Sequence, residues 1–303
     1  MTFEQLAIFV AVAEREHLTR AAAAIGLTPS AVSAAIRNLE GFYGVELFHR
    51  VGRRIALTEA GRTFLGEARA TLARARSAEL VLSELGALKR GQLDLFASQT
   101  IASYWLPPRL MRFHEAHPGI ELRLTVGNTR RVAEAVREGL AEIGFIEGAV
   151  DDPLLAGQAV ARDQMVVVVA PGHPLAGRRR LQAADLLALT DFVMREEGSG
   201  TRSEFESALR QLGADPAALR TALVLPSNEA VLSAVRAATT AAAAVSSAAA
   251  APFVARGDLR ILDFLLPARP FLLLRHRERH RSQAAKALEA ICLARDAAGS
   301  GKV

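Results

Sequence analysis

The chain has 303 residues, half of them hydrophobic, and a formal net charge of +5. Its length indicates two or three domains, and its apolar content excludes a globally disordered protein. The single cysteine, Cys292, excludes an internal disulfide framework, fits a reducing compartment, and is expected to be a small buried hydrophobe on the last helix.

The N-terminal segment does not resemble a secretory signal, because no basic region precedes its apolar residues and Glu4, Glu14 and Glu16 interrupt it. No apolar run elsewhere approaches the ~18–20 uncharged residues that a membrane span requires. We therefore expect a cytoplasmic protein that has no membrane partner.

Apolar residues recur at helical spacing over residues 3–16, 18–25 and 29–43, which predicts three consecutive helices. Gly26 follows the second helix at the place where a left-handed residue ends a helix, a conformation that glycine adopts without a steric penalty. Thr28 is placed to cap the third helix, and Pro29 suits the first helical position, where no N–H is needed. This pattern is typical of a helix-turn-helix, whose second helix enters the DNA major groove.

A two-stranded basic wing is predicted at residues 47–57, turning at Gly52, and a long helix follows over residues 59–89. Its narrow apolar stripe consists of Leu65, Ala68, Leu72, Ala75, Ala78, Leu82 and Leu85. At 1.5 Å per residue the helix would span about 45 Å. A stripe of that length requires a partner, either the same helix of a second chain or the C-terminal part of its own chain.

The pattern changes after residue 91 to strands that alternate with helices. Strands are predicted at 93–97, 120–126, 142–147, 165–170, 191–194, 221–225 and 271–274, and helices at 101–116, 130–138, 202–212, 227–236 and 283–296. This alternation indicates an α/β domain of βαβ units with largely parallel sheets that are covered on both faces.

Five runs of residues near the N-terminus closely resemble the LysR-type family of bacterial transcriptional regulators. They are 18–22 (LTRAA), 28–33 (TPSAVS), 36–40 (IRNLE), 44–50 (GVELFHR) and 53–61 (RRIALTEAG), and weaker similarity continues to the C-terminus. The resemblance implies a winged helix-turn-helix DNA-binding domain over 1–58, a linker and dimerisation helix over 59–90, and an effector-binding domain over 91–303.

The same resemblance implies an effector domain of two α/β lobes of the periplasmic-binding-protein type, lobe one formed by 91–161 and 267–303 and lobe two by 162–266. It implies double-stranded DNA and a small effector as partners, self-association into a homodimer or homotetramer, and RNA polymerase as a further possible partner. Residues 237–244 are alanine and threonine where relatives usually carry glycines, so the local backbone or the effector response is expected to differ there.

DNA contacts are expected from the third helix and from the wing. The helix would present Pro29, Ser30, Ala31, Ser33, Ala34 and Arg37 to the groove, and the wing would place Arg50, Arg53 and Arg54 on phosphates or in the minor groove. Relatives commonly carry an arginine and a glutamine where this chain has Ala34 and Ala35, which shifts recognition toward Arg37 and DNA shape. Solvated charges are the alternative for the wing arginines, and a helix-surface role is the alternative for Arg20, the remaining candidate contact.

Several loops repeat one pattern, in which a strand leads through small polar residues into a helix. The candidate ligand residues in these loops are Ser98, Gln99, Thr100, Gly198, Ser199, Gly200, Thr201, Arg202, Ser227 and Asn228. Helix N-termini attract anions, and α/β sheets bind ligands beyond the carboxyl ends of their strands. Each loop alone could be an ordinary helix cap, but across a two-lobe cleft the loops would form a clamp.

The segment 195–202 is similar to that of family members that respond to small anions, including regulators of sulfur assimilation and carbon fixation. The resemblance implies a compact anion such as sulfite, sulfate or a small carboxylate as the effector. Glu196 and Glu197 must then point away or pair with Arg195 and Arg202. No cofactor is expected.

An enzymatic function is not expected. Ser199 lies in EGSGT, which fails the G-x-S-x-G pattern of a serine nucleophile, and no phosphate-binding loop is present. His114 and His117 lack a third metal ligand, and His276 and His280 lie among arginines that would repel a cation. The predicted function is a ligand-controlled, sequence-specific DNA-binding transcription regulator. The alternative is a solute-binding receptor, which the helix-turn-helix and the missing export signal disfavour.

Overall fold

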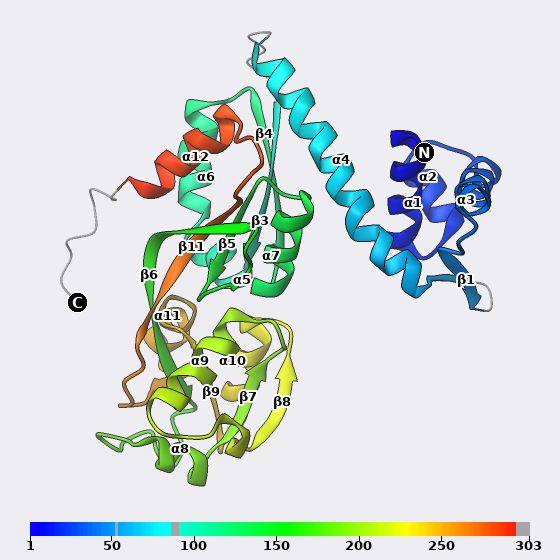
Figure 1. Ribbon diagram of the computed structural model, residues 1–303. Helices are drawn as coiled ribbons and strands as arrows, with labels where there is room; N and C mark the ends of the chain where they lie inside the picture. Colours follow the sequence, from blue (N-terminus) through cyan, green and yellow to red (C-terminus); the bar gives the residue numbers. More distant parts are fainter. Residues whose placement is uncertain (52–53, 86–90, 295–303) are drawn as a thin grey trace. The chain divides into compact units, whose positions relative to one another are not determined.

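The computed structural model describes residues 1–51, 54–85 and 91–294. The chain divides into two compact units, the first comprising Met1–Leu88 and Arg137–Leu140 and the second comprising Lys89–Val136 and Ala141–Val303. Figure 1 shows that the first unit is mainly helical and that the second is built around strands with helices on both sides.

The first unit contains the predicted helix-turn-helix and wing. Its elements are α1 (Phe3–Arg15), α2 (Leu18–Ala24), α3 (Pro29–Tyr43), β1 (Phe48–Val51), β2 (Arg54–Leu57) and α4 (Glu59–Leu85). Thr28 Oγ1 accepts a hydrogen bond from the Ala31 amide at 3.2 Å, and Pro29 occupies the first position of α3. Gly26, with a φ of +68°, makes the turn. The three helices enclose a core in which Phe9 is fully buried.

The wing is tied to the helices through its two ends. Glu40 Oε1 accepts hydrogen bonds from the amides of Leu47 at 2.8 Å and Phe48 at 3.1 Å, so α3 fixes the start of β1. At the other end, Thr58 Oγ1 accepts from the Gly61 amide at 2.9 Å and begins α4. Gly52 and Arg53, where the turn is predicted, lie outside the described residues, as does the predicted end of the long helix at residues 86–89.

The second unit alternates strands and helices along the chain. Its elements are β3 (Gly91–Ser98), α5 (Gln99–Tyr104), α6 (Pro107–Ala116), β4 (Ile120–Gly127), α7 (Thr129–Glu138), β5 (Ile143–Glu147), β6 (Leu155–Val169), α8 (Ala183–Leu189), β7 (Asp191–Arg195), α9 (Gly200–Gln211), the 3₁₀ helix η1 (Pro216–Ala218), β8 (Thr221–Leu225), α10 (Asn228–Arg236), β9 (Ala241–Ser246), α11 (Ser247–Ala255), β10 (Arg260–Ile261), β11 (Ala268–His276) and α12 (Gln283–Leu293). The single helix predicted over 101–116 is wrong. It is two helices, α5 and α6, because Pro107 and Pro108 have no N–H to continue the hydrogen bonds of α5, whereas both suit the first turn of a new helix.

The strands form two lobes that share β6. The strand order is β4-β3-β5-β11-β6-β9-β7-β8, with β10 paired to β6. Residues 155–164 of β6 pair with β11 in lobe one, and residues 165–169 pair with β9 in lobe two (Figure 1). β3 is parallel to β4 and β5, and β7 is parallel to β8 and β9, whereas β6 and β11 are antiparallel to their neighbours. The largely parallel sheet predicted from the alternation therefore holds within each lobe but not at the crossing strands.

The valine run at the end of β6 is buried on both faces of the sheet. Val167 and Val169 pack with Phe192 on one face, and Val168 packs with Val231 on the other. Successive side chains of a strand point to opposite faces, so a strand that is covered on both sides requires an uninterrupted apolar run.

A buried ionic cluster lies where the lobes join. Arg269 of β11, 1% exposed, donates from Nε to Asp163 Oδ2 of β6 at 2.8 Å and from Nη1 to Thr201 Oγ1 of α9 at 3.1 Å. Ser246 donates to the other oxygen of Asp163 at 2.6 Å, and Glu147 of β5 lies 4.0 Å from Arg269 Nη2. These five residues, the Arg269 cluster, link both lobes through a charge that water does not reach.

The alanine- and threonine-rich segment needs no glycine. Ala237 ends α10 with a φ of −85°, and none of the residues 237–244 has a positive φ. Ala241 begins β9, which is buried along its whole length between β6 and β7. Small side chains suit that position because both faces of β9 are covered.

Candidate functional site

The exposed face of α3 carries the predicted DNA contacts. Pro29, Ser30, Ala31 and Arg37 are exposed, and Ser33 and Ala34 are half-buried. Val32, Ile36 and Leu39 face the core instead. Arg37 Nη1 donates to Ser33 Oγ at 2.6 Å, which orders the guanidinium along the exposed face. The side chains that face solvent are therefore those that the helix could bring to a groove.

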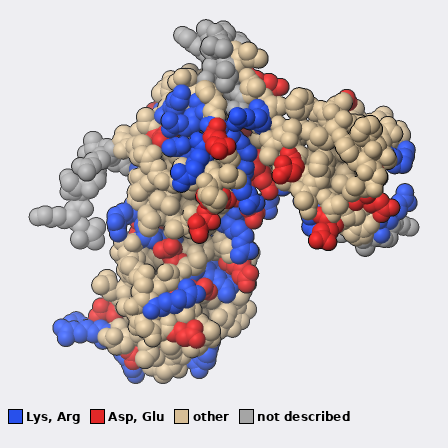
Figure 2. All heavy atoms as spheres, viewed as in Figure 1, with Lys and Arg blue, Asp and Glu red and all other residues tan. Residues whose placement is uncertain are grey.

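Basic residues flank this helix. Arg20 on α2 and Arg50 on β1 are exposed, whereas Arg53 and the side chain of Arg54 lie outside the described residues. Figure 2 shows that Lys and Arg side chains lie among Asp and Glu on the second unit as well as the first. Net charge therefore does not show which unit binds DNA. The evidence for DNA binding is the local arrangement of exposed residues around α3.

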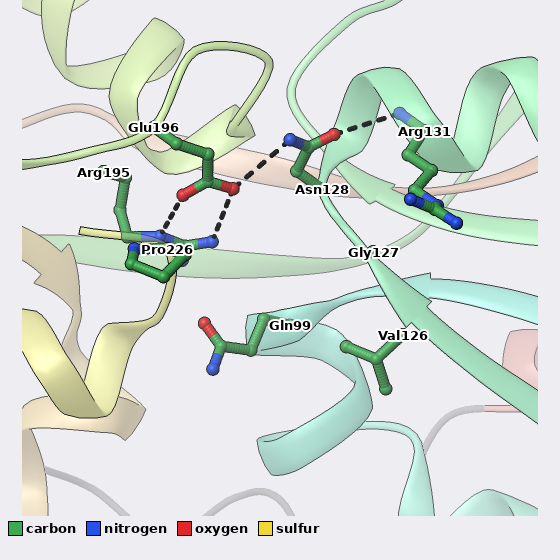
Figure 3. Close-up of a pocket in the computed structure, with 8 residues that line it drawn as sticks. All are labelled: Gln99, Val126, Gly127, Asn128, Arg131, Arg195, Glu196 and Pro226. Carbon is green, nitrogen blue, oxygen red and sulfur yellow. Dashed lines mark hydrogen bonds and ion pairs between the residues drawn. The ribbon is translucent and has the colours of Figure 1, made fainter. Parts of the chain in front are cut away.

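A cavity of about 250 Å³ lies between the two lobes of the second unit. Figure 3 shows its lining residues, which are Gln99, Val126, Gly127, Asn128, Arg131, Arg195, Glu196 and Pro226. Lobe one supplies the first residue of α5, the end of β4 and the start of α7, and lobe two supplies the end of β7 and the residues that follow β7 and β8. The cavity thus lies beyond the carboxyl ends of parallel strands, where open α/β sheets bind ligands.

Arg195 is a buried cation in the wall of this cavity. It is the last residue of β7 and is 5% exposed. Its Nη1 donates to Asn228 Oδ1 at 2.6 Å, and its Nε and Nη2 donate to the two oxygens of Glu196 at 2.8 and 3.1 Å. Burial of a guanidinium is tolerated only with such partners. The cavity therefore contains a fixed donor suited to a carboxylate or another oxyanion.

Hydrogen bonds join the two lobes around the cavity. Gln99 Oε1 accepts a hydrogen bond from the backbone N–H of Asn228 at 2.8 Å. Thr100 Oγ1 accepts one from the side-chain Nδ2 of the same asparagine at 3.1 Å. On another side of the cavity, Asn128 Nδ2 donates to Glu196 Oε1 at 3.3 Å (Figure 3). A ligand that bonds these polar groups would compete with contacts that hold the lobes together.

Glu229 adds a second set of contacts between the lobes. Gln99 Nε2 donates to Glu229 Oε2 at 2.5 Å, and the Tyr104 hydroxyl donates to Glu229 Oε1 at 3.3 Å. Burial, with smaller contributions from the charge and hydrogen bond of Glu229, raises the pKa of Tyr104. The phenol therefore stays protonated and remains a donor at neutral pH.

The predicted hydroxyl groups are buried next to the cavity rather than in its lining. Ser98, Thr100, Ser199 and Thr201 are each at most 3% exposed. Ser98 Oγ has no hydrogen-bond partner among the described residues, whereas Thr201 Oγ1 accepts from Arg269. Of the ten predicted ligand residues, Gln99 alone is in the lining. Asn228 bonds two lining residues directly, since it donates to Gln99 and accepts from Arg195.

The two glycines of the second loop permit a close approach between the lobes. A Cβ on Gly198, whose φ is +84°, would lie 3.0 Å from Arg130 Cβ. A Cβ on Gly200 would lie 2.5 Å from Thr129 Oγ1. In this structure the two glycines therefore allow the loop to pack closely against lobe one, and they do not serve the open cavity.

The remaining charged and capping residues have local partners. Glu196 pairs with Arg195, which is one of the two arrangements expected for it, and Glu197 is exposed. Arg202 Nε pairs with Glu206 at 2.8 Å within α9. Ser227 Oγ accepts from the Ala230 amide at 3.1 Å and caps α10.

Sequence reasoning missed Asn128 and both lining arginines. Asn128 follows the predicted strand 120–126 and precedes a predicted helix, the same pattern that identified the other loops. That signal was available for Asn128 and, one turn later, for Arg131. Arg195 lies inside a buried strand, and its position in the wall depends on lobe packing.

Other classes of site have no support in the described part of the chain. It holds no group of three or more His, Cys, Asp or Glu side chains placed to hold a metal ion. Among the described helices none is long and apolar enough to cross a membrane. Cys292 is 2% exposed, and burial raises the pKa of its thiol to about 12. It is therefore a buried hydrophobe and not a reactive thiolate.

Family models match both units. The model described as "Bacterial regulatory helix-turn-helix protein, lysR family" matches residues 3–62, and the model "LysR substrate binding domain" matches residues 86–297. The RuBisCO operon transcriptional regulator of Allochromatium vinosum is 36% identical over 236 residues, which is 78% of this chain and 76% of that protein. The HTH-type transcriptional regulator CysL of Bacillus subtilis is 32% identical over 235 residues, 78% of this chain and 77% of that protein.

Solved structures show the same fold. Full-length CbnR complexed with its target DNA superimposes with a TM-score of 0.66 at 22% identity, covering 97% of this chain and 99% of that one. The regulatory domain of Synechocystis PCC6803 CcmR in complex with 2-PG has a TM-score of 0.60 at 25% identity, covering 67% of this chain and 96% of that domain. These relatives are regulators and not enzymes. The chain belongs to the LysR family of DNA-binding transcriptional regulators, with an N-terminal helix-turn-helix and a C-terminal two-lobe domain for a small effector.

Proposed function

We propose that the effector of this regulator is a compact anion that binds in the cavity between the lobes. The observation that carries the proposal is the buried guanidinium of Arg195 in the cavity wall, 5% exposed and bonded to a carboxylate in this structure. The amides of Gln99 and Asn128 supply neutral donors on the opposite lobe. Two arginines and two amide side chains among the eight lining residues favour an oxyanion over a hydrophobic effector.

The size of the cavity supports a small ligand. Its volume of about 250 Å³ lies below the roughly 300–1,000 Å³ of pockets for drug-sized molecules. The complex of the related CcmR regulatory domain with 2-PG is consistent with an anion of a few heavy atoms. Sulfate, sulfite and small carboxylates remain the effectors that we expect.

The Arg195→Met variant tests this proposal. In the wild type, sodium sulfate, sodium acetate or 2-phosphoglycolate at about 100 times its Kd should add about 2.7 kcal/mol to the free energy of unfolding, measured at constant ionic strength. Arg195→Met should lose that gain, because the anion loses its buried cation. Arg179→Met, which removes an exposed arginine outside the lining, should keep it. Wild-type protein that no anion stabilises would contradict the proposal.

We propose that α3 reads bases and that the wing binds phosphates. Ser33→Ala or Arg37→Ala should each cost about 1–3 kcal/mol at particular base pairs of the operator, because a base contact discriminates by that amount. Arg50→Ala should instead weaken binding to all sequences alike and lower the salt slope by about one. Binding titrations on operator and scrambled DNA at several salt concentrations measure both effects. An unchanged sequence preference in the α3 variants would refute base recognition by these two residues.

We also propose that α4 mediates self-association into a dimer or tetramer. Ala68 packs into the core of the first unit, but Leu82 further along the same stripe is 69% exposed. An exposed leucine on a helix stripe is explained by a second chain. As a DNA-bound regulator the protein would act in the cytoplasm, with RNA polymerase as the partner that carries its effect to transcription.

A further inference from the structure

The carboxylate of Glu196 occupies the place on Arg195 that an anion would take. Its two oxygens accept from Nε and Nη2 of Arg195 at 2.8 and 3.1 Å (Figure 3). This is the paired geometry by which guanidinium groups bind external carboxylates and oxyanions. The remaining nitrogen of the guanidinium, Nη1, donates a hydrogen bond to Asn228 Oδ1. An incoming anion therefore meets a cation whose paired donors are already used.

Glu196 also links the two lobes. The oxygen that accepts from Arg195 Nη2 accepts from Asn128 Nδ2 at 3.3 Å, and Asn128 belongs to lobe one. Next to it, the Arg130 amide donates to the Gly198 carbonyl at 3.1 Å. Displacement of Glu196 from Arg195 would therefore break one of the contacts between the lobes as well as release the cation.

The side chain of Glu196 lies at the edge of solvent, where it can separate from Arg195. It is 28% exposed at the cavity wall, whereas the side chain of Arg195 is 5% exposed. A carboxylate on the neighbouring residue has a high effective concentration at the guanidinium, as any tethered group does. Water can solvate Glu196 after it is displaced, but it reaches Arg195 far less well, so the cation must keep a partner.

We propose that Glu196 is an intramolecular competitor that sets the affinity of the cavity for anions. The proposal rests on the proposed function, since it presumes an anionic effector on Arg195. When a site is free only part of the time, the apparent Kd is the intrinsic Kd divided by the free fraction. Glu196 thus admits only anions that outcompete a carboxylate for the guanidinium, and it couples their binding to loss of the Asn128 link.

The Glu196→Gln variant tests the proposal in the full-length protein. Glutamine keeps the size and an acceptor oxygen for Asn128 but removes the charge that competes for Arg195. Isothermal titration with sulfate and with 2-phosphoglycolate at fixed ionic strength should give at least a tenfold lower Kd than for the wild type. Glu197→Gln removes the same charge from the adjacent exposed residue and should stay within about twofold of the wild type.

Each other outcome overturns the proposal in a different way. Equal affinity of Glu196→Gln and wild type would refute competition while leaving the anion site in place. Weaker binding to Glu196→Gln would show that the carboxylate helps to hold the ligand. Equal tightening in Glu197→Gln would indicate a general effect of charge. Absence of binding to all three proteins would refute the anionic effector and the competitor together. Glu196→Ala, which should also bind more tightly, checks that the result does not depend on the glutamine amide.

Discussion

Arg269→Met is expected to lower the free energy of unfolding of the second unit by about 3–5 kcal/mol, because removal of one partner of a buried ion pair leaves an uncompensated charge. Arg269 and Asp163 are 1% and 7% exposed and are joined at 2.8 Å. Methionine retains much of the apolar volume, so the loss comes from the stranded carboxylates of Asp163 and Glu147. Urea unfolding followed by the fluorescence of Trp105, the single tryptophan, measures it.

Two further variants make this result specific to burial. Arg220→Met breaks the pair with Asp191 at 3.2 Å, in which the arginine side chain is 56% exposed, and should cost less than about 1 kcal/mol. Asp163→Leu added to Arg269→Met removes one of the two stranded carboxylates, Glu147 being the other, and should recover part of the stability. A loss of the same size at the exposed pair, or no recovery in the double variant, would contradict the role given to the Arg269 cluster.

Gly61→Ala is expected to destabilise the first unit by about 3 kcal/mol, the upper end of the range for overpacking. A Cβ at this position would lie 2.1 Å from the Leu47 carbonyl oxygen and 2.8 Å from Leu57 Cδ2. A backbone carbonyl cannot turn aside as a flexible side chain would, so the start of α4 must separate from the wing. Hydrogen exchange over residues 3–43 of the full-length protein, with operator affinity as a second measurement, reports the loss.

Gly66→Ala in the same helix is the matched control. A Cβ there would have nothing within 4 Å. The same substitution should therefore stabilise α4 by about 0.5–1 kcal/mol, because alanine has the higher helix propensity. Opposite signs at two glycines five residues apart identify the contact with Leu47 as the cause. Similar effects at both positions would refute it.

The N-terminal fold could be predicted closely because its signals are local. The Thr28 cap, the first-position Pro29 and the left-handed Gly26 act within a few residues of themselves, and the structure has all three. The split of the segment 101–116 also has a local signal, since Pro107 and Pro108 mark the start of the second helix.

The crossing of β6 between the lobes could not be predicted from local signals. Only the valine run at its end was recognised, because it is buried on both faces. The earlier part of the strand has a mixed pattern of buried and exposed residues, since it pairs with β11 at the junction. Pairing over more than a hundred residues of sequence separation leaves no local signature in β6 itself.

The loops predicted to bind the ligand form as expected before helices, but the roles of their residues depend on tertiary contacts. Hydroxyl groups before a helix indicate a cap or a ligand equally well, and Ser227 is a cap. Thr201 meets Arg269 only because α9 packs on β9 and β5, and Arg195 reaches the cavity wall only because β7 ends there. Sequence therefore predicted loops that border the cavity, and packing decided which side chains line it.

The most direct test of the account is the affinity of the full-length protein for DNA, measured by fluorescence anisotropy with and without an anion that stabilises it. The DNA upstream of its own gene should bind at least about a thousandfold more tightly than scrambled DNA, as specific regulators do. The anion should change operator affinity by about 5–150-fold in the wild type, the range of typical allosteric coupling, and should have no effect in Arg195→Met. Equal affinity for the two DNAs, or operator affinity that the anion leaves unchanged, would contradict a ligand-controlled, sequence-specific regulator.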